Sequence, residues 1–139
     1  MAVKPERPMP VSTSDTEAYW KATGQGKLLI QRCDSCGVAQ FYPREFCVSC
    51  LSDDITWVEA SGKGRVYTFT LCHIPGNPSR ADKLPYAIAM IDLEEGVRML
   101  TEIVDSSYVL LRVGSPVELV FEKISEEFSL PQFKLRSEE

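Results

Sequence analysis

The sequence lacks any apolar run long enough to cross a membrane. A membrane-spanning helix needs roughly 18 or more consecutive apolar residues, and no stretch of the 139 residues comes near that length. The opening residues, MAVKPERPMPVSTSD, also hold no apolar segment of the kind that a secretory signal carries. We therefore expect a cytoplasmic protein with no membrane partner.

Residue types suited to catalysis are equally scarce. His73 is the single histidine of the chain, so a Cys-His-His or Ser-His-Asp system has almost nothing to draw on. The sequence also contains no nucleophile elbow, phosphate-binding loop or HExxH motif. We nominate no catalytic residue, and we interpret His73 as a strand-end residue with an ordinary hydrogen bond.

Positive charge is in deficit as well. The chain has 15 lysines and arginines against 20 aspartates and glutamates, which gives a formal net charge of −5. This charge would repel a nucleic acid overall, because binding to phosphates depends on lysine and arginine. We therefore expect no nucleic-acid partner.

Cysteine, in contrast, occurs in a pattern that predicts a metal site. The stretch RCDSCGVAQFYPREFCVSC, residues 32–50, holds two CxxC pairs separated by ten residues. Disulfides are disfavoured, because cytosolic thiols stay reduced and a total of five cysteines leaves one unpaired. Two facing CxxC knuckles instead close a tetrahedral thiolate cage, here with the ligands Cys33, Cys36, Cys47 and Cys50.

Zinc is the expected ion of this site, at one per chain, with iron in a rubredoxin-like arrangement as the less favoured alternative. Four protein ligands leave no open coordination position, so the ion would be structural. Gly37 follows the first pair and is expected to relieve the backbone as it turns away from the metal. The fifth cysteine, Cys72, lies in a strand-like stretch and is interpreted as a small buried side chain.

Capping and periodicity predict the elements around these knuckles. Ser14 and Glu17 match an S-x-x-E capping box, so we expect a short helix that ends at Gly24 or Gly26. Apolar alternation predicts two strands around the first knuckle and five or six longer ones from residue 55 onward: KLLIQRC, AQFY, ITWVEA, GRVYTFTLCHI, YAIAMIDLEE, VRMLTEIV, PVELVFEKI and LPQFKLR.

Together these elements predict a mainly β chain, in which an N-terminal short helix and a rubredoxin-like zinc ribbon precede a small OB-fold barrel. We divide the chain into an irregular N-terminal arm at residues 1–12, the helix and zinc ribbon at residues 13–54, and the barrel with a C-terminal tail at residues 55–139. A longer connection at residues 75–85, PGNPSRADKLP, interrupts the barrel strands.

The sequence closely resembles the DUF35 family of small proteins, which have a rubredoxin-like zinc ribbon and an OB-fold. The resemblance covers residues 17 to about 135. Its specific marks are the aromatic pair before a glycine-ended helix, GKLLIQRC before the first knuckle, WVEASGKGRVYTFT after the second, and the GSPVE turn near the end. All four cysteine positions of the family pattern are filled.

The resemblance implies a non-catalytic accessory subunit that works with a thiolase-fold catalytic subunit, in a thiolase, acyltransferase or aldolase complex acting on acyl-CoA thioesters. Such a subunit would stabilise its partner and help to form the acyl-CoA channel, with the acyl-CoA at or near the shared interface. Arg80 and Lys83, the only basic residues of the 75–85 connection, are candidate contacts to the coenzyme A phosphates. Candidate apolar anchors for the partner are Tyr19, Trp20, Phe41 and Phe46. An independent nucleic-acid-binding or regulatory zinc-ribbon protein is the alternative.

Overall fold

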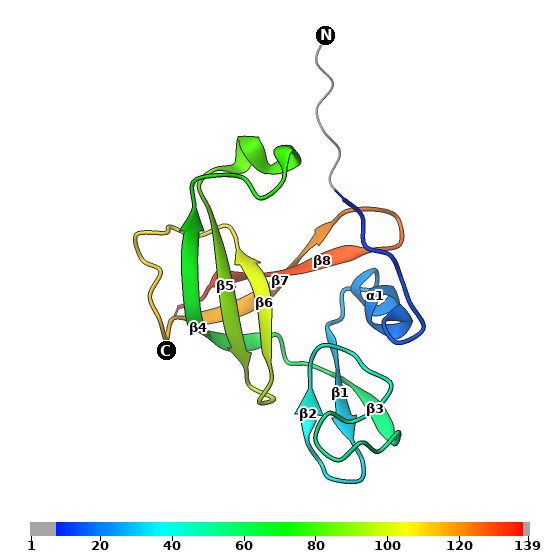
Figure 1. Ribbon diagram of the computed structural model, residues 1–139. Coiled ribbons are helices and arrows are strands. Elements are labelled where there is room, and N and C mark those ends of the chain that lie inside the picture. The colour runs from blue at the N-terminus through cyan, green and yellow to red at the C-terminus, as the bar shows by residue number, and fades with distance from the viewer. Residues whose placement is uncertain (1–7, 138–139) are drawn as a thin grey trace.

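The computed structural model describes residues 8–137 and places them in two β units and one short α-helix. Figure 1 shows helix α1 (Glu17–Thr23) next to the smaller unit, with the larger unit, a barrel, on the other side. Residues 8–12 of the expected N-terminal arm have no regular secondary structure, and residues 1–7 lie outside the described residues. No helix within the described range has the length and apolar character of a membrane span.

The smaller unit is a three-stranded antiparallel sheet in the order β2-β1-β3. Strand β1 (Leu29–Cys33) runs into the first CxxC pair, and β2 (Ala39–Gln40) returns beside it. Strand β3 (Ile55–Glu59) pairs with the whole of β1. We expected this last strand in the barrel, and that assignment is wrong. Apolar alternation predicts that a strand forms, but not which neighbour it pairs with.

The larger unit is a closed five-stranded barrel in the order β4-β5-β6-β8-β7, in which β7 pairs back onto β4. All neighbours are antiparallel except β6 and β8. This small Greek-key barrel is an OB-fold, so the predicted fold class is confirmed. The elements are β4 (Lys63–Cys72), the 3-10 helix η1 (Pro78–Lys83), β5 (Tyr86–Leu93), β6 (Arg98–Ile103), β7 (Pro116–Lys123) and β8 (Ser129–Leu135).

Alternating burial along the strands builds the barrel core. Ala87, Ala89, Ile91 and Leu93 of β5 are buried, and the residues between them are partly covered. Phe133 of β8 is fully buried in the same cluster. This period of two is what places one face of each strand inside the barrel.

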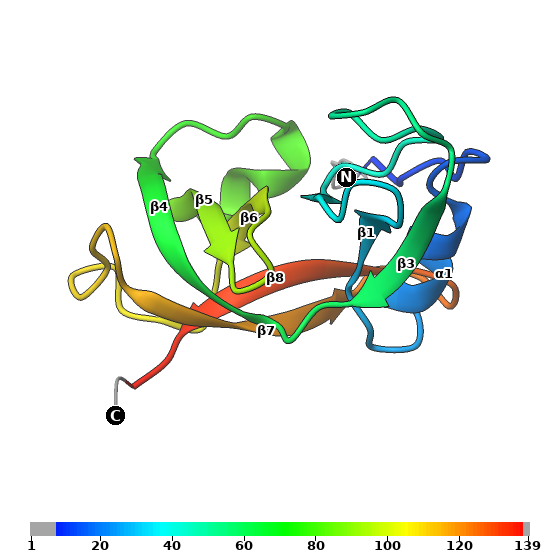
Figure 2. The same cartoon turned by 90° about the horizontal axis from the view of Figure 1, so that it is seen from below.

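The C-terminal end of helix α1 is held against the barrel, and Figure 2 shows β8 passing beside this helix. The buried Thr23 hydroxyl accepts the N–H of Ser129 at 3.1 Å and donates to the Trp20 carbonyl at 2.6 Å. A Cβ at Gly24 would lie 2.3 Å from the carbonyl oxygen of Glu127, so the β7–β8 turn approaches this closely only because residue 24 is glycine. The expected helix end is confirmed, with Gly24 at the C-cap.

The helix begins differently from the prediction. Thr16 occupies the N-cap without a capping hydrogen bond from its side chain, and the Ser14 hydroxyl donates instead to Glu45 Oε1 at 3.3 Å. The carbonyl oxygen of Thr13 accepts the N–H of Glu17 at 2.8 Å. The predicted capping box is therefore wrong, because a backbone turn satisfies the donor that the Ser14 hydroxyl was expected to satisfy.

Phe133→Ala is expected to lower the free energy of unfolding by about 3–5 kcal/mol, because it opens a cavity in a closed core. Denaturant unfolding followed by circular dichroism measures this change. Phe46→Ala is the matched control, because the Phe46 side chain is 54% exposed, and it is expected to change stability by less than about 0.5 kcal/mol. Equal losses for the two variants would contradict this account of the core.

Candidate metal centre and apolar groove

The four predicted cysteine ligands converge at one point. Their sulfur atoms all lie within 4.8 Å of one another. Cys33 Sγ is 3.5 Å from Cys50 Sγ, and Cys36 Sγ is 3.6 Å from Cys47 Sγ. A zinc ion with Zn–S bonds of about 2.3 Å places the sulfurs of a regular tetrahedron about 3.8 Å apart. The donor set and its spacing therefore fit a tetrahedral thiolate metal site.

The two knuckles repeat one backbone turn. The Gly37 N–H donates to the Cys33 carbonyl at 2.8 Å, and the Leu51 N–H donates to the Cys47 carbonyl at 2.9 Å. Both residues take positive φ, +79° at Gly37 and +66° at Leu51. Glycine does this without cost, as expected at Gly37, whereas the leucine conformation costs about 1–2 kcal/mol. Only the glycine turn is predictable from the sequence, because nothing in the residue type of Leu51 signals such a turn.

Backbone N–H groups favour the thiolate form of one cysteine in each knuckle. The Cys36 N–H points to Cys33 Sγ at 3.5 Å and the Cys50 N–H to Cys47 Sγ at 3.5 Å. These donors lower the pKa of Cys33, and they lower the pKa of Cys47 to about 6. Because only the thiolate binds metal, these backbone donors prepare Cys33 and Cys47 for coordination, whereas the pKa values of Cys36 and Cys50 are raised.

A pair of buried glutamines that the sequence analysis missed fixes the second knuckle. Gln31 accepts the N–H of Arg44 at 2.8 Å and donates to the Arg44 carbonyl at 2.9 Å. Gln40 donates to the Phe46 carbonyl at 3.2 Å and accepts the N–H of Val48 at 2.9 Å, so it brackets Cys47. The two amides also bond each other, with Gln40 Nε2 donating to Gln31 Oε1 at 2.7 Å. Gln31 and Gln40 are directly paired in the β1–β2 register, and this pairing is what could have identified them as partners.

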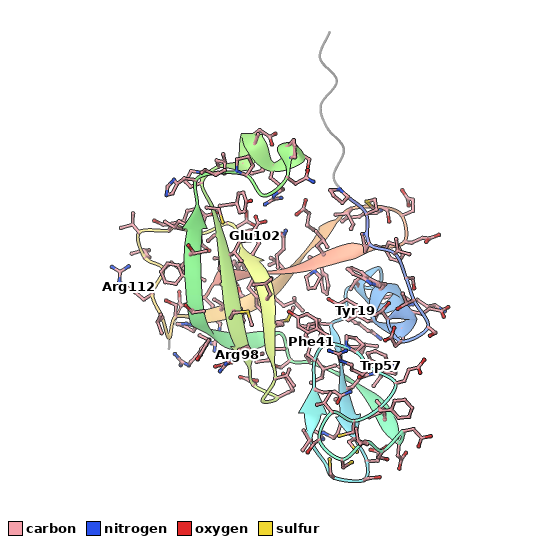
Figure 3. The ribbon with its side chains drawn as sticks, in the orientation of Figure 1. Tyr19, Phe41, Trp57, Arg98, Glu102 and Arg112 are labelled. Atoms are coloured by element: carbon pink, nitrogen blue, oxygen red, sulfur yellow. The ribbon has the colours of Figure 1, made fainter. Side chains whose placement is uncertain are left out.

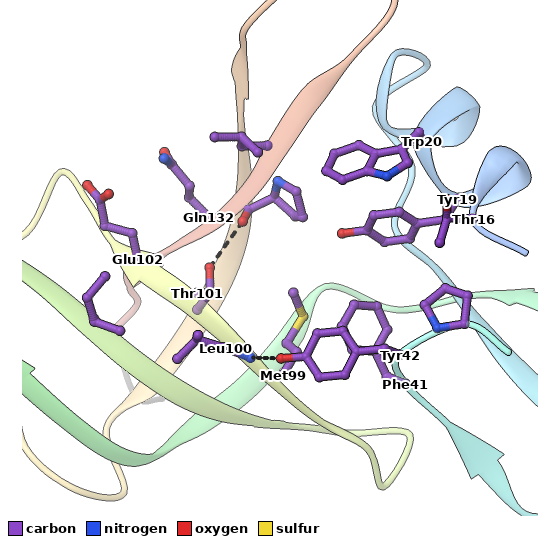
Figure 4. Close-up of a pocket in the computed structure, with 14 residues that line it drawn as sticks. Thr16, Tyr19, Trp20, Phe41, Tyr42, Met99, Leu100, Thr101, Glu102 and Gln132 are labelled. Atoms are coloured by element: carbon purple, nitrogen blue, oxygen red, sulfur yellow. Dashed lines mark hydrogen bonds between the residues drawn. The ribbon is translucent and has the colours of Figure 1, made fainter. Parts of the chain in front are cut away.

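An apolar groove of about 440 Å³ lies where the helix, the β2–knuckle segment and the barrel meet. Figure 4 shows aromatic side chains along one side of it and residues of β6 along the other. The lining is Thr16, Tyr19, Trp20, Phe41, Tyr42, Pro43, Ile88, Met99, Leu100, Thr101, Glu102, Leu130, Pro131 and Gln132. Such a concave apolar site with a few polar groups is typical of a small-molecule binding site.

Ring contacts organise the aromatic wall. The rings of Tyr19 and Phe41 meet edge to face with their centroids 5.6 Å apart, and those of Phe41 and Tyr42 lie 4.6 Å apart (Figure 4). The Tyr42 hydroxyl oxygen accepts the N–H of Leu100 at 3.3 Å and so bridges to the barrel. Tyr19 is buried, and this burial raises its pKa. Tyr19 therefore offers little surface to a partner, whereas Phe46 is exposed at the second knuckle, and the four candidate anchors stay predictions.

The two candidate coenzyme A contacts differ in their surroundings. Arg80 forms an ion pair with Glu102, and its guanidinium lies 4.7 Å from the centre of the Tyr86 ring. Lys83 is exposed at the end of η1. Both line a hollow of about 390 Å³, which shares Glu102 and Gln132 with the apolar groove. The two hollows are therefore contiguous.

Two family models match the chain, the ChsH2 rubredoxin-like zinc ribbon domain at residues 20–56 and the ChsH2 C-terminal OB-fold domain at residues 57–122. A DUF35 domain-containing scaffold protein of Methanocaldococcus jannaschii is 40% identical over 72% of this chain and 71% of that protein. A probable enoyl-CoA hydratase alpha subunit of Thermomonospora curvata is 35% identical over 92% of this chain, which spans only 40% of that relative's length.

A solved structure described as an Ltp2-ChsH2(DUF35) aldolase superposes with a TM-score of 0.81 at 34% identity, over 91% of this chain and 98% of the matched one. The benzoylsuccinyl-CoA thiolase subunit BbsA of Geobacter metallireducens is 35% identical over 52% of this chain and 47% of that subunit. The chain belongs to the DUF35 family of zinc-ribbon and OB-fold proteins, as its resemblance predicted.

One zinc ion per chain is the expected metal content of the purified protein. Cys47→Ser is expected to abolish it and to make the ribbon sensitive to protease, because metal binding and the order of this segment are coupled. Elemental analysis and limited proteolysis measure the two effects. Cys72→Ser, which alters a thiol on β4 outside the cluster, is the control and should retain the zinc. A metal-free preparation with a protease-resistant ribbon would refute this interpretation.

Proposed function

We propose that this DUF35 protein is a non-catalytic scaffold subunit of an acyl-CoA-processing complex, in which a thiolase-fold partner supplies the catalytic residues. Its relatives are named as a scaffold protein and as subunits of hydratase and thiolase enzymes, and the solved neighbour as an aldolase. The apolar groove carries the proposal. Its described lining is mostly apolar and can bind an apolar group. The ionisable groups of this lining are two tyrosines and Glu102, and it contains no thiol, imidazole or amine.

The position of the remaining cysteine, Cys72, supports the proposal that the catalytic residues come from the partner. Thiolase-type chemistry needs a thiolate, a proton acceptor and oxyanion donors at one place. Four cysteines converge on the metal centre. Cys72 is half-buried at the end of β4, and the exposed His73 follows it. Neither residue lines the apolar groove, so this thiol and this imidazole are not placed to act on an acyl group bound there.

The metal centre would act through structure alone. The four cysteines hold the ion, and with all four positions taken it supplies no open site for a substrate. Its contribution is to order the segment between β2 and the second knuckle, which carries Phe41 and Tyr42. The zinc ribbon thereby helps to build one wall of the groove.

In the complex, the groove would line the acyl channel. An acyl group would lie against the aromatic wall, because transfer of apolar surface from water into such a site is favourable. The contiguous hollow beside η1 would receive the polar coenzyme A portion. Lys83 is the better-placed phosphate contact of the two residues, since the Arg80 guanidinium already pairs with Glu102. Closure of the channel would shield the thioester and stabilise the partner.

Co-expression with a candidate thiolase-fold protein from the same genome, followed by affinity purification through this chain, is expected to recover a hetero-oligomer. The complex should cleave or form acyl-CoA, and the isolated chain should not. Size-exclusion chromatography with light scattering and a thioester assay measure the two outcomes. Recovery of a partnerless monomer, or turnover by the chain alone, would overturn the proposal.

Lys83→Ala is expected to weaken acyl-CoA binding by the complex about fivefold, which corresponds to roughly 1 kcal/mol for one exposed charge pair. Titration calorimetry at low ionic strength measures the change. Lys123→Ala is the matched control, since Lys123 is an exposed lysine at the end of β7. Arg80 is left intact, because its removal would strand the Glu102 carboxylate in a partly buried site. An unchanged affinity would remove Lys83 from the binding site.

A further inference from the structure

One hydroxyl group in the wall of the apolar groove has no hydrogen-bond partner within the part of the chain that the structure describes. It belongs to Tyr19, which is only 7% exposed and forms no hydrogen bond through its side chain. The Tyr19 ring packs against those of Trp20 and Phe41, with centroids 5.0 Å and 5.6 Å away. Because the hydroxyl of a buried tyrosine usually has a partner, its acceptor is expected to come from outside the described residues.

The hydroxyl group of Tyr19 is open to the groove. Figure 4 shows its oxygen turned from the aromatic wall toward the space in front of Thr101. Figure 3 shows Tyr19 on the side of the helix and Glu102 on the barrel. Residues 8–12, the described part of the N-terminal arm, do not line the groove. The hydroxyl therefore faces a hollow of about 440 Å³ that a ligand can enter.

Three polar side chains on the barrel side of the groove are already engaged. The Thr101 hydroxyl donates to the Pro131 carbonyl at 3.1 Å, and Gln132 Nε2 donates to Glu122 Oε2 at 2.6 Å. The Glu102 carboxylate is held by its ion pair beside η1. These groups position one another across the barrel, and the tyrosine hydroxyl on the opposite wall is left for a ligand.

The charge of the groove selects the kind of acceptor. Burial, and to a smaller extent the neighbouring Tyr42, raises the pKa of Tyr19, so the phenol keeps its proton at neutral pH and can donate it. The lining of the groove contains no lysine, arginine or histidine. An anionic acceptor would therefore be buried without a countercharge, which is costly. The groove suits an uncharged oxygen instead.

We propose that the Tyr19 hydroxyl donates a hydrogen bond to an uncharged carbonyl oxygen of the bound acyl group, at a position remote from the thioester. This inference rests on the proposed function and names its substrate class, which is acyl groups that carry a second carbonyl, such as a ketone on a ring or chain. The position is remote because Tyr19 belongs to the aromatic wall, whereas the hollow for coenzyme A adjoins Glu102 on the barrel.

The hydroxyl determines specificity because the groove around it is apolar. A hydrocarbon acyl group would cover the hydroxyl and leave it without an acceptor, which costs free energy, whereas a ketone at the same place would accept its proton. A site that hydrogen-bonds a polar group of the ligand rejects the analogue lacking that group more strongly than an apolar pocket rejects a missing methylene. Tyr19 is thus a specificity-determining residue, and the catalytic residues stay with the partner.

Acetophenone and ethylbenzene test this hydrogen bond, because they differ only in a carbonyl that replaces a methylene. Nuclear magnetic resonance titration of the zinc-containing full-length chain measures both dissociation constants at the Trp20 indole and the Leu100 amide, which lie in the lining. Tyr19→Phe is expected to weaken acetophenone binding about fivefold, as for one neutral hydrogen bond, and not to weaken ethylbenzene binding. Tyr67→Phe is the matched control, since Tyr67 is 50% exposed on β4 outside the groove lining, and it should bind both probes as the wild type does.

A vibrational measurement distinguishes a hydrogen bond from a change in packing. The carbonyl stretch of carbon-13-labelled acetophenone falls in frequency when its oxygen accepts a hydrogen bond. We expect a lower frequency for the probe bound to the wild type or to Tyr67→Phe than for the probe bound to Tyr19→Phe. Tyr19→Phe is also expected to retain its zinc and its unfolding midpoint, because the removed hydroxyl bonds no described residue. A lowered midpoint would give the hydroxyl a structural role and overturn the inference.

The remaining outcomes decide whether the site belongs to the acyl group. Failure of both probes to bind, an equal effect of Tyr19→Phe on both, or an unchanged carbonyl stretch would refute this inference alone. If the free chain lowers the carbonyl frequency and the co-purified complex does not, a group of the partner fills the site, and the inference is overturned in favour of a protein contact. A wild-type chain that recovers no partner would refute the proposed function, and the acyl-group assignment with it.

Discussion

Four cysteine sulfurs lie within 4.8 Å of one another, and the path of the chain between them builds the rest of the site. The segment that leaves β2 and enters the second knuckle carries Phe41 and Tyr42, which form one wall of the groove. Gln31 and Gln40 bond the backbone of this segment from within the ribbon sheet. A metal held by these four sulfurs would thus help to set the shape of a groove that it does not touch.

The ribbon and the barrel depend on this constraint to different degrees. The barrel closes its own hydrogen-bond ladder and holds most of the buried apolar cluster, which also includes Tyr19, Leu28 and Ile30 of the helix and ribbon. The ribbon has three short strands, and β2 contributes only two residues, so its order is expected to depend on coordination of a metal. The groove spans both units, and the Tyr42 to Leu100 hydrogen bond crosses between them. The groove therefore has one side on the barrel and one on the ribbon, and the ribbon side is the one expected to depend on the metal.

Local sequence signals made the four-cysteine cluster and the barrel strands predictable. Strand partners, ion pairs and the groove could not be predicted, because they join residues that are far apart in the sequence. CxxC spacing is a local property, and so is the alternation that identified every strand of the barrel. The ITWVEA strand was recognised but placed in the wrong sheet, because pairing partners leave no local mark. Arg80 was chosen as an available cation, yet its carboxylate partner, Glu102, lies 22 positions further along the chain. The groove was missed for the same reason, since its lining comes from five separate segments.

The ion pair of Arg80 and Glu102 lies at one side of the groove and makes that side polar. Figure 4 shows Glu102 on the opposite side of the groove from Trp20 and Tyr42. Its side chain is 19% exposed and that of Arg80 is 15% exposed, and such a pair contributes little net stability because both charges lose hydration. Its value is geometric, since it divides an apolar hollow from a polar one. Under the proposed function, a thioester would bind with its acyl group toward the aromatic wall and its phosphates toward Lys83, and a reversed orientation would bury phosphate against aromatic rings.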